Sequence, residues 1–378
     1  MLCMKNMIKI SKLNPNKMSA RSLTLVFCSF FVLASCQVKK STETEVPVSA
    51  RWTTEQAKAW QDQYGWLRGC NFNPSTAINQ LETWQAETFD EETIDRELGW
   101  AEDIGMNCMR VYLHHVAWEV DPAGFKGRMD RYLEIADSHG ISTIFVFFDD
   151  CWNPVYSAGK QPDPKPGIHN SGWVRDPGDL LFEDSTLIYV LEEYFKDVMS
   201  RFKDDKRIAV WDLYNEPGNR GYGKNSMPLL KSAFEWGREV KPSQPLSVGL
   251  WNNSLTEFNI FQLEHSDIIT YHNYKGPEQH RQAIDSLKKY GRPMVCTEYM
   301  ARKFNSTFQS IMPMLAEEGV GAINWGLVAG KSNTKYAWGE PIPDGSDPEL
   351  WFHEIFRPDG TPYSQEEVDV IMKLTGVE

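Results

Sequence analysis

Two glutamates stand at the ends of apolar segments of the sequence. Glu216 directly follows the apolar segment 208–215, and the Pro217-Gly218 turn stops that segment at once. Glu298 lies near the end of a second apolar segment, 293–299. Two such acids can share a reaction if one is protonated and donates a proton while the other is ionised and attacks carbon. Their environments must then push their two pKa values apart.

The distance between the two glutamates along the chain, 298 − 216 = 82 residues, suits opposite sides of a barrel. In a (β/α)8 barrel the carboxyl ends of the strands form one rim, where active sites lie. Two carboxyl groups about 5–5.5 Å apart are the arrangement that a retaining glycosidase requires. The pair therefore suggests cleavage of a glycosidic bond.

The segments that would carry these residues recur regularly. Each apolar run is followed by a turn signal and then by an amphipathic helical pattern, as in 187–202. The eight apolar runs are 68–73, 106–113, 141–148, 208–215, 245–251, 267–273, 293–299 and 321–327. Eight such units predict an α/β fold of the (β/α)8 (TIM) barrel type, one catalytic domain over 51–378 with a closing helix at 364–374. The alternative is an open doubly wound sheet, but the first strand–helix turn lacks its glycine-rich phosphate loop.

Further polar and aromatic side chains fall at the ends of these runs. We expect Arg110 and Tyr274 to reach Glu298 and keep it ionised, Asn215 to hold a sugar 2-hydroxyl, and Trp325 to floor the site. The full set of candidate supporting residues is Arg110, His114, Asp150, Trp152, Trp173, Asn215, His272, Tyr274 and Trp325.

Several of these positions have two interpretations. Asp149 and Asp150 either bind sugar hydroxyls or cap the loop that follows them. His114 and His115 compete for one place beyond Arg110. A neutral histidine in a polar rim would look the same in sequence as a substrate-binding His272.

The order Arg110, Asn215-Glu216-Pro217, His272-x-Tyr274, Glu298 and Trp325 resembles glycoside hydrolase family 5, the cellulase family, and its clan of retaining barrel enzymes. The resemblance covers residues 66 to about 340. It implies that Glu216 is the acid/base and Glu298 the nucleophile, that the other residues in this order support the site, and that a β-linked polysaccharide or oligosaccharide is the ligand.

The segment 152–178 is long and rich in proline and glycine, and long loops of this kind are usually functional or disordered. Its Trp152, His169 and Trp173 suggest a wall of the cleft. An open cleft would make the enzyme endo-acting and a closed one exo-acting, and the sequence does not decide between them or name the sugar.

Two other functions remain as alternatives. A surface lipoprotein that binds glycans without cleaving them shares the aromatic residues. A metal-dependent barrel hydrolase would need His-x-His within 68–73, which is absent. His114, His115 and Asp150 match no metal-ligand spacing, so we expect no metal and no cofactor.

The formal net charge is −13. Residues 1–35 hold five basic side chains and no acid, so the remainder carries −13 − 5 = −18. An acidic body argues against nucleic acid as a partner and fits a neutral ligand.

Residues 1–35 are typical of a lipoprotein signal peptide, for which Met18 is an alternative start. The apolar run Leu23 to Ala34 is too short to span a bilayer and ends at Ser35-Cys36. This pattern predicts a lipid on Cys36, a flexible tether over 36–50 and, with Gln37 next, an exported outer-membrane lipoprotein that touches the membrane only through its anchor. The alternative is an ordinary cleaved secretory signal.

Four cysteines fall in the body of the chain, beside apolar runs and without metal-ligand spacing. They are expected to be buried free thiols, and one disulfide is the alternative. They are Cys70, Cys108, Cys151 and Cys296.

Overall fold

The computed structural model describes residues 51–377. The predicted signal peptide (1–35), the lipidation site Cys36 and the tether (36–50) lie outside the described residues. No helix of the described part is long and apolar enough to cross a membrane.

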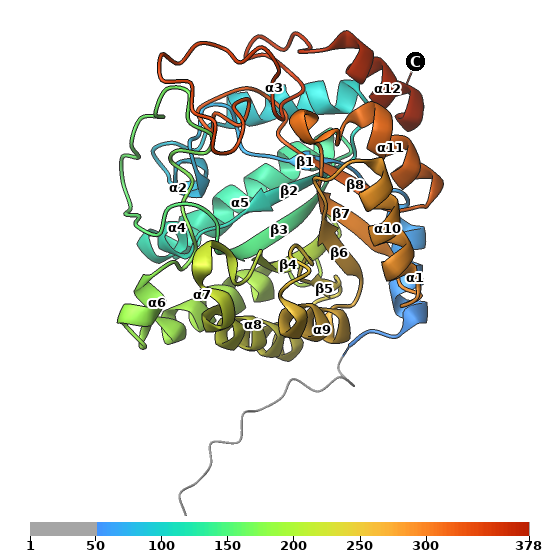
Figure 1. Cartoon of the computed structure of the whole chain (residues 1–378). Helices are drawn as coiled ribbons and strands as arrows, with labels where there is room; N and C mark the ends of the chain where they lie inside the picture. The colour runs from blue at the N-terminus through green and yellow to red at the C-terminus, as the bar shows by residue number, and fades with distance from the viewer. Residues whose placement is uncertain (1–50, 378) are drawn as a thin grey trace, which may run out of the picture. The chain divides into compact units, whose positions relative to one another are not determined.

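Eight parallel strands form a nearly closed barrel (Figure 1). Their order in the sheet is β5-β4-β3-β2-β1-β8-β7-β6. The strands are β1 (Arg68–Asn71), β2 (Cys108–Tyr112), β3 (Ser142–Asp149), β4 (Ile208–Asn215), β5 (Leu246–Ser247), β6 (Ile269–His272), β7 (Met294–Glu298) and β8 (Gly321–Trp325).

The seam between β5 and β6 is joined by only a few bonds, because β5 has two residues. The Leu250 N–H donates to the Thr270 carbonyl at 3.0 Å, and the His272 N–H donates to the Leu250 carbonyl at 2.8 Å. These bonds bring the two edges together. The predicted (β/α)8 barrel is thereby confirmed, and the open doubly wound sheet is excluded.

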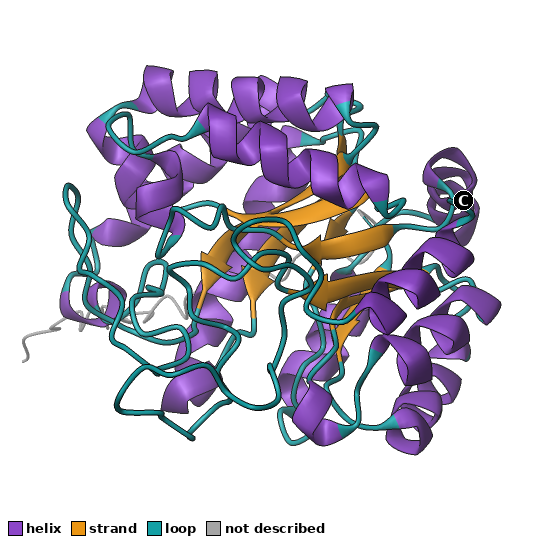
Figure 2. Cartoon of the chain, turned by 90° about the horizontal axis from the view of Figure 1, so that it is seen from above, coloured by secondary structure: helices purple, strands orange, loops and turns teal. Residues whose placement is uncertain are grey.

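Helices surround the strands, and long loops cover one end of the barrel (Figure 2). The α-helices are α1 (Thr54–Tyr64), α2 (Gln80–Trp84), α3 (Glu91–Asp103), α4 (His115–Val120), α5 (Pro122–Ser138), α6 (Leu180–Glu183), α7 (Leu187–Phe202), α8 (Met227–Val240), α9 (Thr256–His265), α10 (Pro277–Lys288), α11 (Phe308–Glu317) and α12 (Gln365–Thr375). Short 3₁₀ turns are η2 (Asn219–Gly221), η3 (Gly223–Ser226) and η4 (Arg302–Phe304).

The helices begin where the sequence supplies capping side chains. The Asp90 carboxylate accepts from the Thr93 N–H at the start of α3, and Ser364 caps α12 in the same way. Along α3, Ile94, Leu98 and Ala101 are fully buried, as their spacing indicates.

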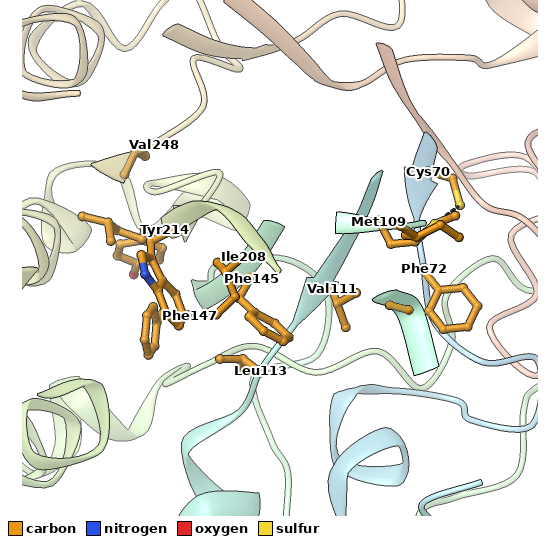
Figure 3. Packing of buried hydrophobic residues seen from close by; sticks show 14 of the residues in the cluster. Cys70, Phe72, Met109, Val111, Leu113, Phe145, Phe147, Ile208, Tyr214 and Val248 are labelled. Atoms are coloured by element: carbon orange, nitrogen blue, oxygen red, sulfur yellow. Dashed lines mark hydrogen bonds between the residues drawn. The ribbon is translucent and has the colours of Figure 1, made fainter. Parts of the chain in front are cut away.

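The main core lies between the strands and the helices. Aromatic rings fill much of it: Phe147 of β3 lies 4.2 Å from Phe195 of α7 and 5.3 Å from Trp211 of β4, measured between ring centroids. Figure 3 shows part of this packing, from Cys70 and Met109 to Tyr214 and Val248. A smaller cluster joins Ala57 and Trp60 of α1 to the strands, where the Trp60 indole donates to the Ala209 carbonyl at 2.8 Å.

The last helix contributes to the core through Ile371, which is fully buried on α12 against α11. We expect Ile371→Ala to lower the free energy of unfolding by about 2–5 kcal/mol, because it removes buried methyl groups and leaves a cavity. Urea unfolding of the two proteins measures the difference. Asp369→Ala, on the exposed face of α12, is the control and should change stability by less than about 0.5 kcal/mol. Equal stability of wild type and Ile371→Ala would show that α12 does not belong to the cooperative core.

Candidate active site

A cleft of about 1790 Å³ opens at the carboxyl ends of the strands. Most of the residues predicted from the sequence line it together. They are Glu216, Glu298, Asn215, His272, Tyr274, Trp152 and Trp325, with His169 from the long loop.

A sharp backbone turn positions Glu216. Strand β4 ends at Asn215, which pairs with Asp149, and Glu216 then takes a φ of 46°, in the left-handed region. A residue other than glycine held there stores about 1–3 kcal/mol of strain. The Gly218 N–H donates to the Asp150 carboxylate at 2.7 Å, so the turn is fixed from behind.

The two glutamates face each other across His272. Its Nδ1 lies 2.9 Å from Glu216 Oε1 and 3.5 Å from Glu298 Oε2. One oxygen of each carboxylate and a ring nitrogen of His272 all lie within 4.8 Å of one another. This approach of the nearest oxygens is closer than the roughly 6.5–9.5 Å between carboxyls in inverting enzymes and lies near the range of retaining glycosidases.

Glu298 is surrounded by donors. Arg110 Nη1 donates to Oε1 at 2.8 Å and the Tyr112 hydroxyl donates to the same oxygen at 3.0 Å. The Tyr274 hydroxyl donates to Oε2 at 2.9 Å. A fixed guanidinium and two hydroxyls therefore stabilise a negative charge on this carboxylate.

Arg110 itself is completely buried. Its guanidinium pairs with Asp212 of β4 at 2.8 Å, and it donates to Asn71 and Asn215 at 2.8 Å each. The pairing orients the side chain toward Glu298. Burial raises the pKa of Asp212, although Arg110 beside it acts in the opposite direction.

Glu216 has weaker, uncharged donors besides His272. Asn219 Nδ2 donates to Oε2 at 2.5 Å, and the Cys151 thiol donates to the same oxygen at 3.3 Å. Burial raises the pKa of Glu216, but the hydrogen bond and charge of His272, with the Cys151 and Asn219 bonds, outweigh burial and lower the pKa overall.

Asn215 is fixed in orientation. Its amide N–H donates to Asp149 at 2.9 Å and its carbonyl accepts from Arg110. Burial raises the pKa of Asp149 to about 7. These two bonds fix the orientation in which the Asn215 amide lines the cleft. Its contact with a sugar hydroxyl stays a prediction.

Besides the buried Arg110, which reaches Glu298 as expected, three of the expected supporting residues do not line the cleft. His114 is fully buried, where Nδ1 accepts the Val116 N–H and caps α4 while Nε2 contacts the Arg175 carbonyl. Asp150 accepts bonds from Tyr214, Ser226 and Gly218, so it holds the turn after β4 and neither caps its own loop nor binds sugar.

Trp173 is the third residue to be corrected. Only 3% of its surface is exposed, its indole donates to Asp149 at 2.7 Å, and its ring packs edge-on against Tyr112. Its centroid lies 5.8 Å from that of Trp325. It supports Trp325 from behind and does not form the cleft wall.

The arrangement of these residues can be compared with known proteins. Residues 69–331 match the model of cellulase, glycosyl hydrolase family 5. The chain belongs to glycosyl hydrolase family 5. It is therefore a glycoside hydrolase, as the sequence predicted. A comparison with curated protein sequences finds no match.

Solved structures share the fold at low sequence identity. The endo-beta-1,4-mannanase from Thermotoga petrophila is 15% identical with a TM-score of 0.55, over 84% of this chain and 77% of that one. The exo-beta-1,4-mannosidase from Opitutaceae bacterium strain TAV5 is 16% identical with a TM-score of 0.59, over 82% and 59%. A GH5_18 variant from Bifidobacterium longum subsp. longum, in complex with Manb1-4GlcNAc, is 12% identical with a TM-score of 0.55, over 82% and 78%.

Among the described residues, two clusters have donor atoms close enough for a metal: Glu216, His272 and Glu298, and the buried His114, His115 and Asp176. At the first, the Arg110 guanidinium already pairs with Glu298 and repels a second cation. At the second, both ring nitrogens of His114 have protein partners. Their bonding accounts for both clusters without an ion.

Sequence reasoning missed several site residues. Tyr112 could have been found, because it lies two residues after Arg110 on the same face of a strand. Cys151, Asn219, Arg220 and Trp338 lie outside the strands and the α-helices and carried no spacing signal. The four described body cysteines are buried and free, as predicted, and no disulfide joins them.

The bond from Cys151 to Glu216 can be tested by titration. Cys151→Ala removes a donor to the ionised carboxylate, so we expect the pKa of Glu216 to rise. ¹³C NMR titration of labelled glutamate carboxyls measures it, with Glu216→Gln to assign the signal. Cys151→Ser keeps a donor and serves as the matched control. A rise of equal size in both variants would contradict a role for the hydrogen bond.

Proposed function

We propose that the protein hydrolyses β-glycosidic bonds with retention of configuration, with Glu298 as nucleophile and Glu216 as acid/base. The observation that carries the proposal is the pair of carboxylates within 4.8 Å in unlike environments. Glu298 has a guanidinium and two hydroxyls around it, whereas Glu216 has an amide, a thiol and His272.

In the first step Glu298 attacks the anomeric carbon while Glu216 gives its proton to the glycosidic oxygen, and the bond to the leaving sugar breaks. A covalent glycosyl-enzyme forms. In the second step Glu216, now ionised, takes a proton from water, and the resulting oxygen displaces Glu298 from the same carbon. Two displacements return the original anomer.

The change of role at Glu216 requires a pKa that rises when substrate binds. A neutral sugar over the carboxyl removes water and weakens its contact with His272, and the charge on Glu298 then disfavours a second negative charge nearby. Attack on carbon neutralises Glu298 and lets Glu216 ionise. The proximity of the two acids thus drives the alternation.

The ligand is proposed to be a β-1,4-linked mannoside. The similar structures include proteins described as an endo-beta-1,4-mannanase and an exo-beta-1,4-mannosidase, and one complex with Manb1-4GlcNAc. Trp152, Trp251 and Trp325 line the cleft, and flat aromatic rings of this kind suit the apolar faces of sugars. The acidic chain also suits a neutral ligand.

The test is hydrolysis of aryl β-mannosides, β-glucosides and β-xylosides by wild type and variants. Glu298→Ala should abolish release of every aglycone. Glu216→Ala should slow the hydrolysis of glycosides with poor leaving groups by about 10²–10⁴-fold. It should slow dinitrophenyl glycosides much less, because dinitrophenolate leaves without a proton. ¹H NMR of the first product should show the β anomer.

Glu278→Ala is the control, because Glu278 is an exposed carboxylate of the same cleft away from the pair. It should keep wild-type activity. An α anomer as first product would refute the retaining assignment. Glycan binding with no hydrolysis by the folded wild type would favour the non-catalytic lipoprotein instead.

We also propose that the protein is exported and held at a membrane by a lipid on Cys36. The support is the apolar run Leu23 to Ala34 followed by Ser35-Cys36. Labelled palmitate should enter the wild type in a bacterial host, and Cys36→Ala should lose the label and leave the membrane fraction. Cys70→Ala is the control and should keep the label. Labelling of Cys36→Ala would contradict this anchor.

A further inference from the structure

Two loops meet above the barrel on one side of the cleft. They follow β3 (residues 150–179) and β8 (residues 326–364), two strands separated by β1 and β2 in the sheet. The Asn170 N–H donates to the Ser332 carbonyl at 2.9 Å, and the Ile342 N–H donates to the Gly167 carbonyl at 3.0 Å. Backbone bonds therefore tie the loops together across the ends of β1 and β2.

His169 fastens the same two loops at the surface of the cleft. Its Nδ1 lies 2.7 Å from the Tyr336 carbonyl, and the Trp338 indole donates to its Nε2 at 3.0 Å. The ring therefore carries its proton on Nδ1, donates to Tyr336 and accepts from Trp338. Burial lowers the pKa of His169 to about 4, so the ring is neutral and both bonds hold at neutral pH.

Three residues of the fastened loops, Trp152, His169 and Trp338, form a continuous aromatic wall with Tyr274, which follows β6. Successive ring centroids along this wall lie 5.2, 6.1 and 4.9 Å apart. All four residues line the cleft. Neighbouring rings are therefore in contact, and no sugar ring fits between them.

The space behind the wall is filled. Asn79 donates to the Gly172 carbonyl at 2.9 Å, and a Cβ at Gly172 would lie 2.2 Å from the Ile78 side chain. A cavity lined by Tyr112, Trp173 and Trp325 measures about 20 Å³, room for about one water. Among the described residues, none from the segments that follow β1 and β2 lines the cleft.

The cleft continues on the other side, over the loops after β4, β5 and β6. Its lining there includes Arg220, Trp251, Asn252, Asn273 and Lys275. Glu216 follows β4 and stands at this open side. The acid/base stands beside the leaving group, so the leaving chain extends over these loops.

The sugar that is attacked must lie over Glu298, against Trp325 and the wall. Trp325 is 6.5 Å from His353, and His353 is 5.8 Å from Trp338, between ring centroids. From this geometry we infer that the enzyme is exo-acting and removes one sugar at a time from the non-reducing end. The inference rests on the function proposed above, because the roles of Glu216 and Glu298 define the two sides.

The first experiment uses the full-length protein and a β-1,4-linked hexasaccharide with a fluorescent label at the reducing end. Its sugar is the one whose aryl glycoside is cleaved, with mannohexaose tried first. The earliest products should be free monosaccharide and labelled pentasaccharide. Labelled di-, tri- or tetrasaccharide at early times would overturn the inference. If every hexasaccharide and aryl glycoside stays intact, the proposed function fails as well.

The second experiment blocks the non-reducing end of the same hexasaccharide with a 4,6-O-benzylidene group. The rate should fall by about 100-fold, because the blocked ring cannot seat against the wall. An unchanged rate would overturn the inference even though hydrolysis itself, and its loss in Glu298→Ala, would still support the proposed function.

Variants test the wall directly. Trp338→Ala removes a ring of the wall and should raise the rate on the blocked substrate relative to the open one at least several-fold. Val155→Ala is the control, because Val155 lies in the partner loop after β3, is 81% exposed and does not line the cleft. If Trp338→Ala folds and the ratio of the rates on the blocked and open substrates is unchanged, the wall does not exclude the blocked end. If the variant does not fold, the two experiments on the wild type decide the inference.

Discussion

The buried guanidinium of Arg110 is the constraint on which the site and the barrel both depend. A cation without water costs several kcal/mol unless charges and lone pairs surround it. Its partners come from four strands: Asn71 of β1, Tyr112 of β2, Asp212 and Asn215 of β4, and Glu298 of β7. The hydrogen bonds of this one cation therefore hold β4 and β7 at a fixed separation. Because Glu216 follows β4 and Glu298 ends β7, the same bonds place the two glutamates face to face.

A second buried network, around Asp149 and Asp150, joins the end of β3 to the end of β4. Asp149 accepts from Asn215, Trp173 and the Cys151 N–H, while Asp150 accepts from Tyr214, Ser226 and Gly218. Neither aspartate is available to a ligand. They fix the turn that gives Glu216 its left-handed backbone, so residues without substrate contact still determine where the acid points.

Much of this arrangement is predictable from the sequence, because strand ends in a barrel have a known location. The alternating apolar runs gave the fold, and Arg110, Glu216, His272, Tyr274 and Glu298 each lie where a strand or its end places them. Loop contacts are different. His114, Asp150 and Trp173 were expected at the cleft but are taken up by buried hydrogen bonds and packing.

Loop partners could not be predicted because they depend on tertiary contacts. Nothing in the spacing of His169 and Trp338, 338 − 169 = 169 residues apart, indicates that one ring accepts a bond from the other. The same holds for Cys151 beside Glu216. The role of a loop residue depends on which other loop packs against it in the folded chain. Local sequence periodicity carries no information about such contacts.

The aromatic wall determines which bonds of a polymer the enzyme can cleave. In a cleft closed on the glycone side, each polymer chain offers one productive position, however long the chain is. The effective concentration is then that of chain termini, so a given mass of long polymer is a dilute substrate and the same mass of fragments a concentrated one. Turnover on polymer would accelerate wherever an internally cleaving activity creates new termini nearby.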